Sequence, residues 1–322
     1  MIGYLLIFLI SLTASLVLTF FLIPRLLRAK MVGNDINKSN RPEIAEMGGI
    51  AIVAGTTGGI LFAIFLHTFF GWTFDLTFML AALITIHSIA FIGLVDDIVD
   101  IPQAVKALLP LVAAIPLIVV KAAGSTALTI PIIGTLDFGL LYILVLIPIG
   151  IAVASNLTNM LAGFNGMESG MGIVMFLAIA IISLLTGNNL MLIISLSMLG
   201  ALLGFFWFNR YPSKVFPGDV GNLVIGGTLA CTVIVGNTEG IGAILVIPYV
   251  IDFFIKALNK FPSKGWAGIL KNGKLYAPDK PISFAQYVMK FSKGISEAKL
   301  ALFFITLEVI FAIIAILLYA RF

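Results

Sequence analysis

Four short polar segments interrupt an otherwise apolar chain, and their side chains are of the types that bind metal ions and phosphates. They contain Asp96 and Asp97, then Asn156, Asn159 and Asn165, then Asp219, and finally a group of lysines between residues 256 and 299. Carboxylate and amide oxygens suit Mg²⁺, which commonly joins one or two protein carboxylates to bound phosphates. Lysine supplies a compact positive charge for phosphate. If the four segments meet, they form a site for phosphate chemistry.

The composition indicates that lipid surrounds most of the chain. Hydrophobic residues make up 61% and charged residues 11% of the 322 residues, and the mean hydropathy is +1.16. A soluble domain cannot bury so much apolar surface. We predict an all-α, polytopic integral membrane protein, a single catalytic domain over residues 1–322 with about ten transmembrane helices and small hairpins in its loops. The expected spans are 2–23, 48–70, 77–95, 103–120, 138–156, 169–187, 189–208, 220–237, 240–258 and 298–320.

Basic residues predict the orientation of these spans. Lys and Arg collect after the spans at 2–23, 189–208 and 240–258, whereas the opposite side has only Lys121 and Arg321. Cytoplasmic loops are rich in Lys and Arg. We therefore expect both termini outside, and every polar segment on the cytoplasmic face. The net charge of +4 reflects topology and attraction to membrane lipids, and no nucleic acid is expected as a partner. The cytoplasmic loops are expected at about 24–47, 96–102, 157–168, 209–219 and 259–297.

Local signals add two hairpins and several bends. Residues 124–137 outside and residues 269–276 inside have the pattern of short strand pairs, the second with an Asn272-Gly273 turn. Prolines within the spans are expected to bend them. These are Pro110, Pro116, Pro148 and Pro248.

The acids after the third span allow more than one interpretation. Asp96, Asp97 and Asp100 repel one another unless a cation offsets them, and Lys106 is near enough in sequence to do so. The same D-D-x-x-D string could bind the diphosphate of an intramembrane prenyltransferase. Such an enzyme needs a second aspartate-rich motif, and Asp219 stands without one. An acidic helix end at the interface with no further role is the third alternative.

The remaining polar residues also have two interpretations each. Asp219 opens a span, where it would either cap the helix or bind a metal. Asp252 and Lys256 are spaced for an ion pair within a span, and a buried acid there is a functional candidate. A secondary transporter is an alternative for the whole chain, but it would place its charges near mid-membrane. Here the polar clusters lie at one boundary.

Four motifs, in order, resemble those of the polyprenyl-phosphate N-acetylhexosamine-1-phosphate transferases of glycosyltransferase family 4. The resemblance is greatest to the archaeal and eukaryotic branch that makes GlcNAc-diphosphodolichol, and it covers most of the chain. Ala45 replaces a proline of the family pattern. The motifs are Asp35-Ile36-Asn37-Lys38 with Ile44-Ala45-Glu46, then Asp96-Asp97 with Lys106, then residues 156–168 (NLTNMLAGFNGME), then residues 211–219 (YPSKVFPGD).

The resemblance implies a ten-span fold and a reaction. The reaction is Mg²⁺-dependent transfer of a sugar 1-phosphate, with GlcNAc the expected sugar, from a UDP-sugar to a polyprenyl (dolichyl) phosphate. UMP is released, and the product begins a lipid-linked oligosaccharide, as in N-glycosylation. The short loops favour the plasma membrane of a prokaryote, with an archaeon expected, and the endoplasmic reticulum of a eukaryote is the alternative. A homodimer is left open.

The resemblance also implies roles for individual residues. Mg²⁺, or Mn²⁺ in its place, would be held by Asp219 and Asn159. Asn165 would contact uracil with Glu46 near the nucleotide, Lys106 would bind phosphate, and Asp96 and Asp97 would position or deprotonate the lipid phosphate. Asn156 and Lys38 are further candidates for substrate binding.

One segment departs from the family. Eukaryotic members have Arg-His-Arg in the loop after the ninth span, and bacterial relatives have a histidine-rich stretch there. This chain has Phe261-Pro262-Ser263-Lys264-Gly265-Trp266 instead. We therefore assign the missing charge to Lys264, with Lys271 as an alternative, and Trp266 lies against the sugar or at the lipid interface. In the family this loop contacts the sugar and the diphosphate, so the departure bears on the donor sugar and not on the type of reaction.

Overall fold

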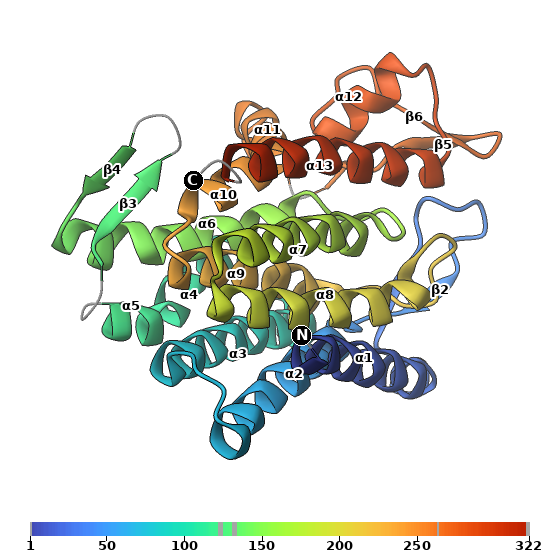
Figure 1. Cartoon of the computed structure of the whole chain (residues 1–322). Helices are drawn as coiled ribbons and strands as arrows, with labels where there is room; N and C mark the ends of the chain where they lie inside the picture. Colours follow the sequence, from blue (N-terminus) through green and yellow to red (C-terminus); the bar gives the residue numbers. More distant parts are fainter. Residues whose placement is uncertain (1, 122–124, 131–133, 263, 320–322) are drawn as a thin grey trace.

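The computed structural model describes residues 2–121, 125–130, 134–262 and 264–319 and shows a bundle of long helices with short hairpins at its ends (Figure 1). In this part of the chain, nine helical spans are long and apolar enough to cross a membrane, with Gln103–Lys121 and Tyr142–Met160 each counted as one span. The bent pair α10 (Glu239–Leu245) and α11 (Ile247–Leu258) brings the number to ten when it is counted as one span. The prediction of an all-α, polytopic membrane protein with about ten spans is therefore confirmed.

The helices follow the expected spans but several extend further. Helix α3 (Leu76–Val99) continues through Asp96 and Asp97, and α6 (Ile147–Met160) continues through Asn156 and Asn159. These residues therefore lie near the ends of helices and not in loops. A short helix, α12 (Phe284–Phe291), precedes the last span. The other helices are α1 (Ile2–Arg28), α2 (Gly49–Phe70), α4 (Gln103–Ala113), α5 (Ile115–Lys121), η1 (Tyr142–Leu146), α7 (Met167–Thr186), α8 (Asn189–Asn209), α9 (Gly218–Val235) and α13 (Glu297–Tyr319).

The breaks within spans lie next to prolines. Helices α10 and α11 meet at 60°, and Pro248 stands in the first turn of α11. Pro116 likewise follows the break between α4 and α5, and Pro148 follows η1. Proline has no N–H to donate, so it is tolerated at the start of a helical segment. Pro110, in contrast, lies inside α4.

Three antiparallel strand pairs lie at the ends of the bundle. The predicted hairpins are confirmed as β3 (Ala127–Ile130) with β4 (Gly134–Asp137), and β5 (Ile269–Lys271) with β6 (Lys274–Tyr276). Asn272 and Gly273 both have positive φ, as this two-residue turn requires. The third pair, β1 (Val32–Asn34) with β2 (Glu43–Ala45), was not predicted.

Helix α9 is the centre of the bundle and fixes the position of the polar helix ends. It packs between α3 and α6, with α2 and α8 beside them. Gly93 of α3 lies against Val220, and Gly226 of α9 lies against the Ala154 carbonyl, where an added Cβ would come within 2.5 Å and 2.0 Å of those neighbours. Small residues allow such close approach between helices in lipid. The ends of α3, α6 and α9 are thereby brought together.

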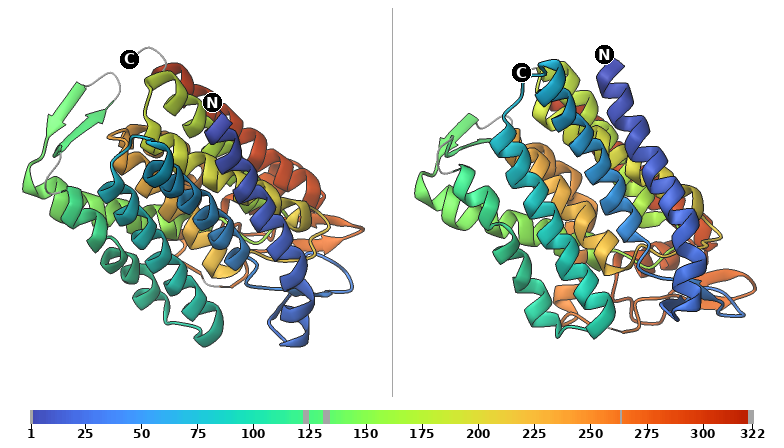
Figure 2. Two further views of the ribbon diagram at one scale, coloured as in Figure 1. Left: turned by 60° about the horizontal axis from the view of Figure 1, so that its bottom comes forward. Right: turned by 90° about the horizontal axis from the view of Figure 1, so that it is seen from below.

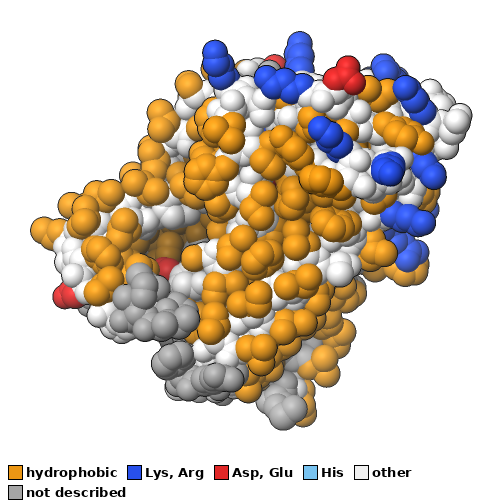
Figure 3. All heavy atoms as spheres, turned by 90° about the horizontal axis from the view of Figure 1, so that it is seen from above, with side chains coloured by type: hydrophobic (Ala, Val, Ile, Leu, Met, Phe, Trp, Pro, Cys, Tyr) orange, Lys and Arg blue, Asp and Glu red, His pale blue; other side chains and the backbone are white. Residues whose placement is uncertain are grey.

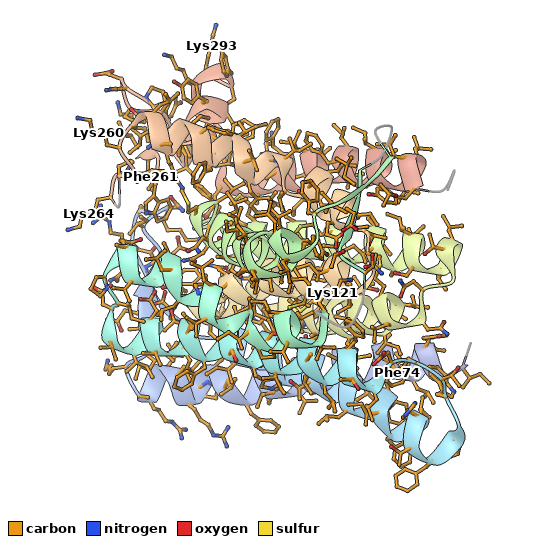
Figure 4. The ribbon with its side chains drawn as sticks, turned by 90° about the vertical axis from the view of Figure 1, so that its left-hand side faces the viewer. Phe74, Lys121, Lys260, Phe261, Lys264 and Lys293 are labelled. Atoms are coloured by element: carbon orange, nitrogen blue, oxygen red, sulfur yellow. The ribbon has the colours of Figure 1, made fainter. Side chains whose placement is uncertain are left out.

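The two ends of the bundle differ in charge. Helix α1 begins and α13 ends at the same end (Figure 2), as an even number of spans requires. Figure 3 shows Lys and Arg side chains along the upper and right margins of one face and none at its lower left. In Figure 4, Lys260, Lys264 and Lys293 lie at one end, and Phe74 lies at the other. That the basic end faces the cytoplasm stays a prediction.

Candidate functional site

A cavity of 1190 Å³ lies at the basic end of the bundle, where α3, α6 and α11 end and α4 and α9 begin. It has a polar part and an apolar part, which we call the limb. The limb lies between α4, α6 and α11 and is lined by Ala104, Ala107, Ala152, Val153, Val250, Phe253 and Phe254. The polar part contains Glu46, Asp97, Lys106, Asn159, Asp219 and Asn222. Helices α3, α4, α6, α9 and α11 supply most of the helical lining, and α7 and α8 contribute Glu168 and Asn209.

Asp219 is directed toward the cavity because another carboxylate caps its helix. The backbone N–H groups of Asp219 and Val220 donate to the Asp97 carboxylate at 2.7 and 3.1 Å. Asp97 of α3 thus satisfies the N-terminus of α9. Asp219 is the one residue of α9, a helix described in full, that is not buried. Of the two interpretations of Asp219, the cap therefore belongs to Asp97, and the Asp219 side chain is left to face the cavity.

Lys106 joins two acids from different helices. Its Nζ lies 2.6 Å from Asp219 Oδ2 and also forms an ion pair with Asp96. Asp96 is buried and accepts a further hydrogen bond from the Ile101 N–H at 2.8 Å. Of the three neighbouring acids that Lys106 was expected to offset, the ion pair is confirmed for Asp96, and the second partner, Asp219, comes from another helix. Asp100 differs, because it is exposed, ends α3 with a positive φ, and is not among the described residues that line the cavity.

The charge of the cavity wall favours a bound cation. Its acids outnumber its bases, and the pKa of Glu46 is raised by burial and by the nearby charge of Asp219. A phosphate ligand would be repelled by this wall unless a cation accompanied it. The acids are Asp35, Glu46, Asp97, Glu168 and Asp219, and the bases are Lys106 and Lys256.

The donor set fits Mg²⁺ in part. Asn222 donates to Asn159 Oδ1 at 3.2 Å, and Asn222 Oδ1 is buried without a hydrogen-bond partner. Together with Asp219, these amides offer the oxygen ligands that Mg²⁺ prefers. Among the described residues, however, no group of three or more His, Cys, Asp or Glu side chains could hold a metal ion. A magnesium site here would need further oxygens from a bound phosphate, as is usual for this ion.

Asn156 lies in the cavity wall but its amide serves the helices. Its Nδ2 donates to the Ala107 carbonyl at 3.1 Å and to the Ala152 carbonyl at 2.8 Å. The side chain therefore ties α6 to α4 beside the limb. Neither hydrogen bond involves the amide oxygen of Asn156, and a role in substrate binding stays a prediction.

Asn165 and Lys38 belong to a buried network beside the cavity. Asn165 Oδ1 accepts hydrogen bonds from Lys38 Nζ and the Ser213 N–H, each at 2.8 Å, and its Nδ2 donates to Asp35 at 3.2 Å. Burial would lower the pKa of Lys38, but the hydrogen bond to Asp35 and the charge of Glu297 outweigh it and raise the pKa. Lys38 and Asn165 are not among the described residues that line the cavity. They fasten the loops around it, and contact with a ligand stays a prediction.

Glu297 is the member of this network that sequence reasoning missed. Its Oε1 accepts from the Asn165 N–H at 3.0 Å and from Asn37 at 3.3 Å, and its Oε2 lies 3.2 Å from Lys38 Nζ. It joins the first residue of α13 to segments more than 100 positions away. A glutamate at a helix start has no local signal that would reveal such contacts.

We expect Glu297→Gln to destabilise the protein by about 1–3 kcal/mol, because a buried acceptor for Lys38 and two N–H donors is weakened. Thermal unfolding in detergent measures the change. Glu43→Gln is the matched control, because the Glu43 side chain is exposed and its ion pair with the exposed Lys30 is long, at 4.0 Å. It should leave the unfolding temperature unchanged. Equal unfolding temperatures for the two variants would contradict the role given to the network.

The loop after α11 places different residues at the cavity than expected. Lys264 is exposed and, like Lys271, does not line the cavity within the part of the chain that the structure describes. Trp266 does, with its ring edge-on to Phe164 at 5.9 Å. Gly163 has φ +111°, and an added Cβ there would lie 2.3 Å from the Trp266 ring. Lys256, paired with Asp252 at 2.7 Å as the spacing predicted, is the basic residue that α11 contributes to the wall.

Comparison with known proteins identifies a family whose matched region contains the main residues of this cavity. The model of the family described as glycosyl transferase family 4 matches residues 79–237, which contain Asp97, Lys106, Asn159 and Asp219. A protein of Saccharolobus solfataricus, provisionally named UDP-N-acetylglucosamine–dolichyl-phosphate N-acetylglucosaminephosphotransferase, is 38% identical over 96% of this chain and 95% of its own length. A protein of the same provisional name from Sulfolobus acidocaldarius is 34% identical over 98% and 96%.

A bacterial relative extends the comparison. The phospho-N-acetylmuramoyl-pentapeptide-transferase of Limosilactobacillus fermentum is 30% identical over 76% of this chain and 79% of its own length. The similarity to the archaeal relatives covers nearly the whole of each chain. This chain belongs to glycosyl transferase family 4 and, within it, to the phosphoglycosyltransferases.

Proposed function

We propose that this enzyme transfers a sugar 1-phosphate, GlcNAc 1-phosphate, from UDP-GlcNAc to a polyprenyl (dolichyl) phosphate. The products are UMP and GlcNAc-diphospho-polyprenol, the first intermediate of a lipid-linked glycan. The main structural support for this reaction is a single cavity that contains acids, amides and lysines together with the apolar limb between α4, α6 and α11. The names of the archaeal relatives support the same donor and acceptor.

The limb fits the acceptor. A prenyl chain is apolar, and the limb is lined by alanine, valine and phenylalanine side chains of three membrane-spanning segments. The acceptor phosphate would remain in the polar part, since its charge is costly in lipid. If the reaction takes place at the ends of the helices, the prenyl chain of the acceptor stays in the membrane throughout.

The transfer makes one P–O bond and breaks another. An oxygen of the lipid phosphate attacks the β-phosphorus of the UDP-sugar, and the bond from that phosphorus to the bridging oxygen breaks, so that UMP leaves with the electron pair. When bound by Asp219, Asn159 and the diphosphate, Mg²⁺ or Mn²⁺ would offset charge on the leaving UMP. Lys106 would contact a phosphate oxygen, and its ion pairs with Asp96 and Asp219 hold it in place. Asp97 would act by positioning Asp219, because both its oxygens accept backbone hydrogen bonds from α9.

The alternatives have less support. A prenyltransferase using the D-D-x-x-D string would need Asp100 beside Asp96 and Asp97, and its side chain is exposed. A transporter is not favoured by relatives that are named as transferases. We further propose that the cavity faces the cytoplasm of a prokaryotic cell, with both termini outside, which the basic residues at the cavity end support.

Purified protein with radiolabelled UDP-GlcNAc, dolichyl phosphate and Mg²⁺ tests the proposal. We expect label in the organic phase, equal release of UMP, and loss of both with EDTA. Transfer only from another UDP-sugar would correct the donor and leave the reaction. No transfer from any nucleotide sugar, with prenyl phosphate confirmed to bind, would refute the proposed function.

A further inference from the structure

A second lysine lies in the cavity wall next to the apolar limb. Of the described residues that line the cavity, Lys106 and Lys256 are basic. Lys256 is in the last turn of α11, and its side chain is 11% exposed. Phe253 lies three residues earlier, on the same face of the helix, and lines the limb. The side chain of Lys256 therefore lies next to the limb, and its ammonium contacts Met160, which also lines the cavity.

Contacts from two helices fix this ammonium. Nζ lies 2.7 Å from Asp252 Oδ2 and donates a hydrogen bond to the Met160 carbonyl at the end of α6. Asp252 is fully buried and also accepts from the Phe284 N–H at 2.8 Å. A lysine ammonium has three N–H donors. The Met160 carbonyl uses one of them, whereas Asp252 Oδ2 is within ion-pair distance but accepts no hydrogen bond among the described residues. N–H donors of Lys256 therefore remain for a ligand in the cavity that this residue lines.

Lys256 is the less neutralised of the two cavity lysines. Lys106 lies between two carboxylates, Asp96 and Asp219. Lys256 has a single carboxylate partner, and its other contact is to a neutral carbonyl. Its charge is already removed from water, so a phosphate that reached it would form a charge-assisted hydrogen bond without a large new desolvation cost.

We propose that Lys256 binds the phosphate of the lipid acceptor at the inner end of the limb. This inference rests on the proposed function and names the residue that recognises one of its substrates. The acceptor is favoured over the donor diphosphate because Phe253, one helical turn before Lys256, lines the limb. A prenyl chain in the limb then leads its phosphate to this ammonium.

Four variants test the assignment. Lys256→Met removes the charge, and Lys256→Arg keeps it. The double variant Asp252→Asn/Lys256→Met also removes the lysine charge but leaves no unpaired buried carboxylate. It therefore tests the contact even if Lys256→Met alone fails to fold. Lys260→Met is the matched control, since Lys260 is exposed and lies four residues further along the chain at the same end (Figure 4).

We measure KM for a short-chain polyprenyl phosphate and for UDP-GlcNAc. For Lys256→Met and the double variant we expect KM for the acceptor to rise about tenfold, with KM for the donor changed by less than about twofold. Lys256→Arg should recover most of the acceptor affinity, and Lys260→Met should match the wild type. Binding of the same prenyl phosphate and of its prenol, without donor, separates the phosphate contact from the shape of the limb. Prenol binding should not change.

Several results would overturn the inference. A rise in KM for UDP-GlcNAc alone would assign Lys256 to the donor. Equal loss of prenol and prenyl phosphate binding would mean that the substitution only distorts the limb. A wild-type acceptor KM in the double variant would exclude the contact. The binding measurement needs no turnover, so it tests Lys256 even if no sugar transfer is found.

Discussion

Asp219→Asn is expected to lower turnover by at least about 10³-fold while the protein remains folded. The substitution keeps the size of the side chain but removes the negative charge that would hold Mg²⁺. Asp219 is the carboxylate at the start of α9 that faces the cavity, whereas Asp97 already satisfies the backbone there. Lys106 loses the charge of Asp219 but keeps its ion pair with Asp96, so the protein should stay folded and lose about 1–2 kcal/mol of unfolding free energy. Turnover is measured as transfer of label to lipid over a range of Mg²⁺ concentrations.

Asp100→Asn is the matched control for Asp219→Asn. It removes an acid from the same end of the bundle, but one that is exposed and outside the cavity wall. It should keep wild-type turnover and the same Mg²⁺ dependence. Loss of activity in Asp100→Asn would instead favour the prenyltransferase alternative, in which the whole D-D-x-x-D string binds diphosphate. Unchanged turnover in Asp219→Asn would remove the metal assignment.

Those parts of the structure that local pattern determines could be predicted from sequence. Apolar runs of bilayer length gave the spans, because lipid forces helices on any chain that crosses it. The Asn272-Gly273 turn gave its hairpin because both residues accept positive φ. The pairing of Lys106 with Asp96 followed from their closeness in sequence and the repulsion of neighbouring carboxylates.

The rest depends on contacts between residues far apart in sequence. Asp97 accepts a hydrogen bond from the N–H of Asp219, which is 122 positions later, and nothing near Asp97 in sequence indicates that partner. The same holds for Glu297, whose partner Asn165 is 132 positions away. Lys256 was assigned to an ion pair from its spacing with Asp252, but its place in the cavity wall depends on the bend between α10 and α11. The spacing of two residues on a helix predicts that they form an ion pair, but it does not predict which cavity the pair lines.

Lys106→Met should both destabilise the protein and abolish transfer. Removing one member of a buried ion pair costs about 3–5 kcal/mol, because the remaining charges are left without compensation. Here Asp96 is buried and Asp219 is partly buried beside it, and both depend on the same ammonium. We also expect transfer to fall by at least about 10²-fold, since the contact between Lys106 and a phosphate oxygen is lost. Loss of stability alone could explain lost activity, so the two effects need separate variants.

The double variant Asp96→Asn/Lys106→Met separates them. It removes one of the two uncompensated carboxylates, so more than half of the lost stability should return, while transfer remains as low as in Lys106→Met. Lys121→Met is the control, because Lys121 is equally buried but lies away from the cavity, donating to the Ile234 carbonyl at 2.9 Å (Figure 4). It should lower the unfolding temperature and keep transfer per folded molecule. If transfer returned with stability in the double variant, Lys106 would serve to hold Asp96 and Asp219 and would have no contact with phosphate.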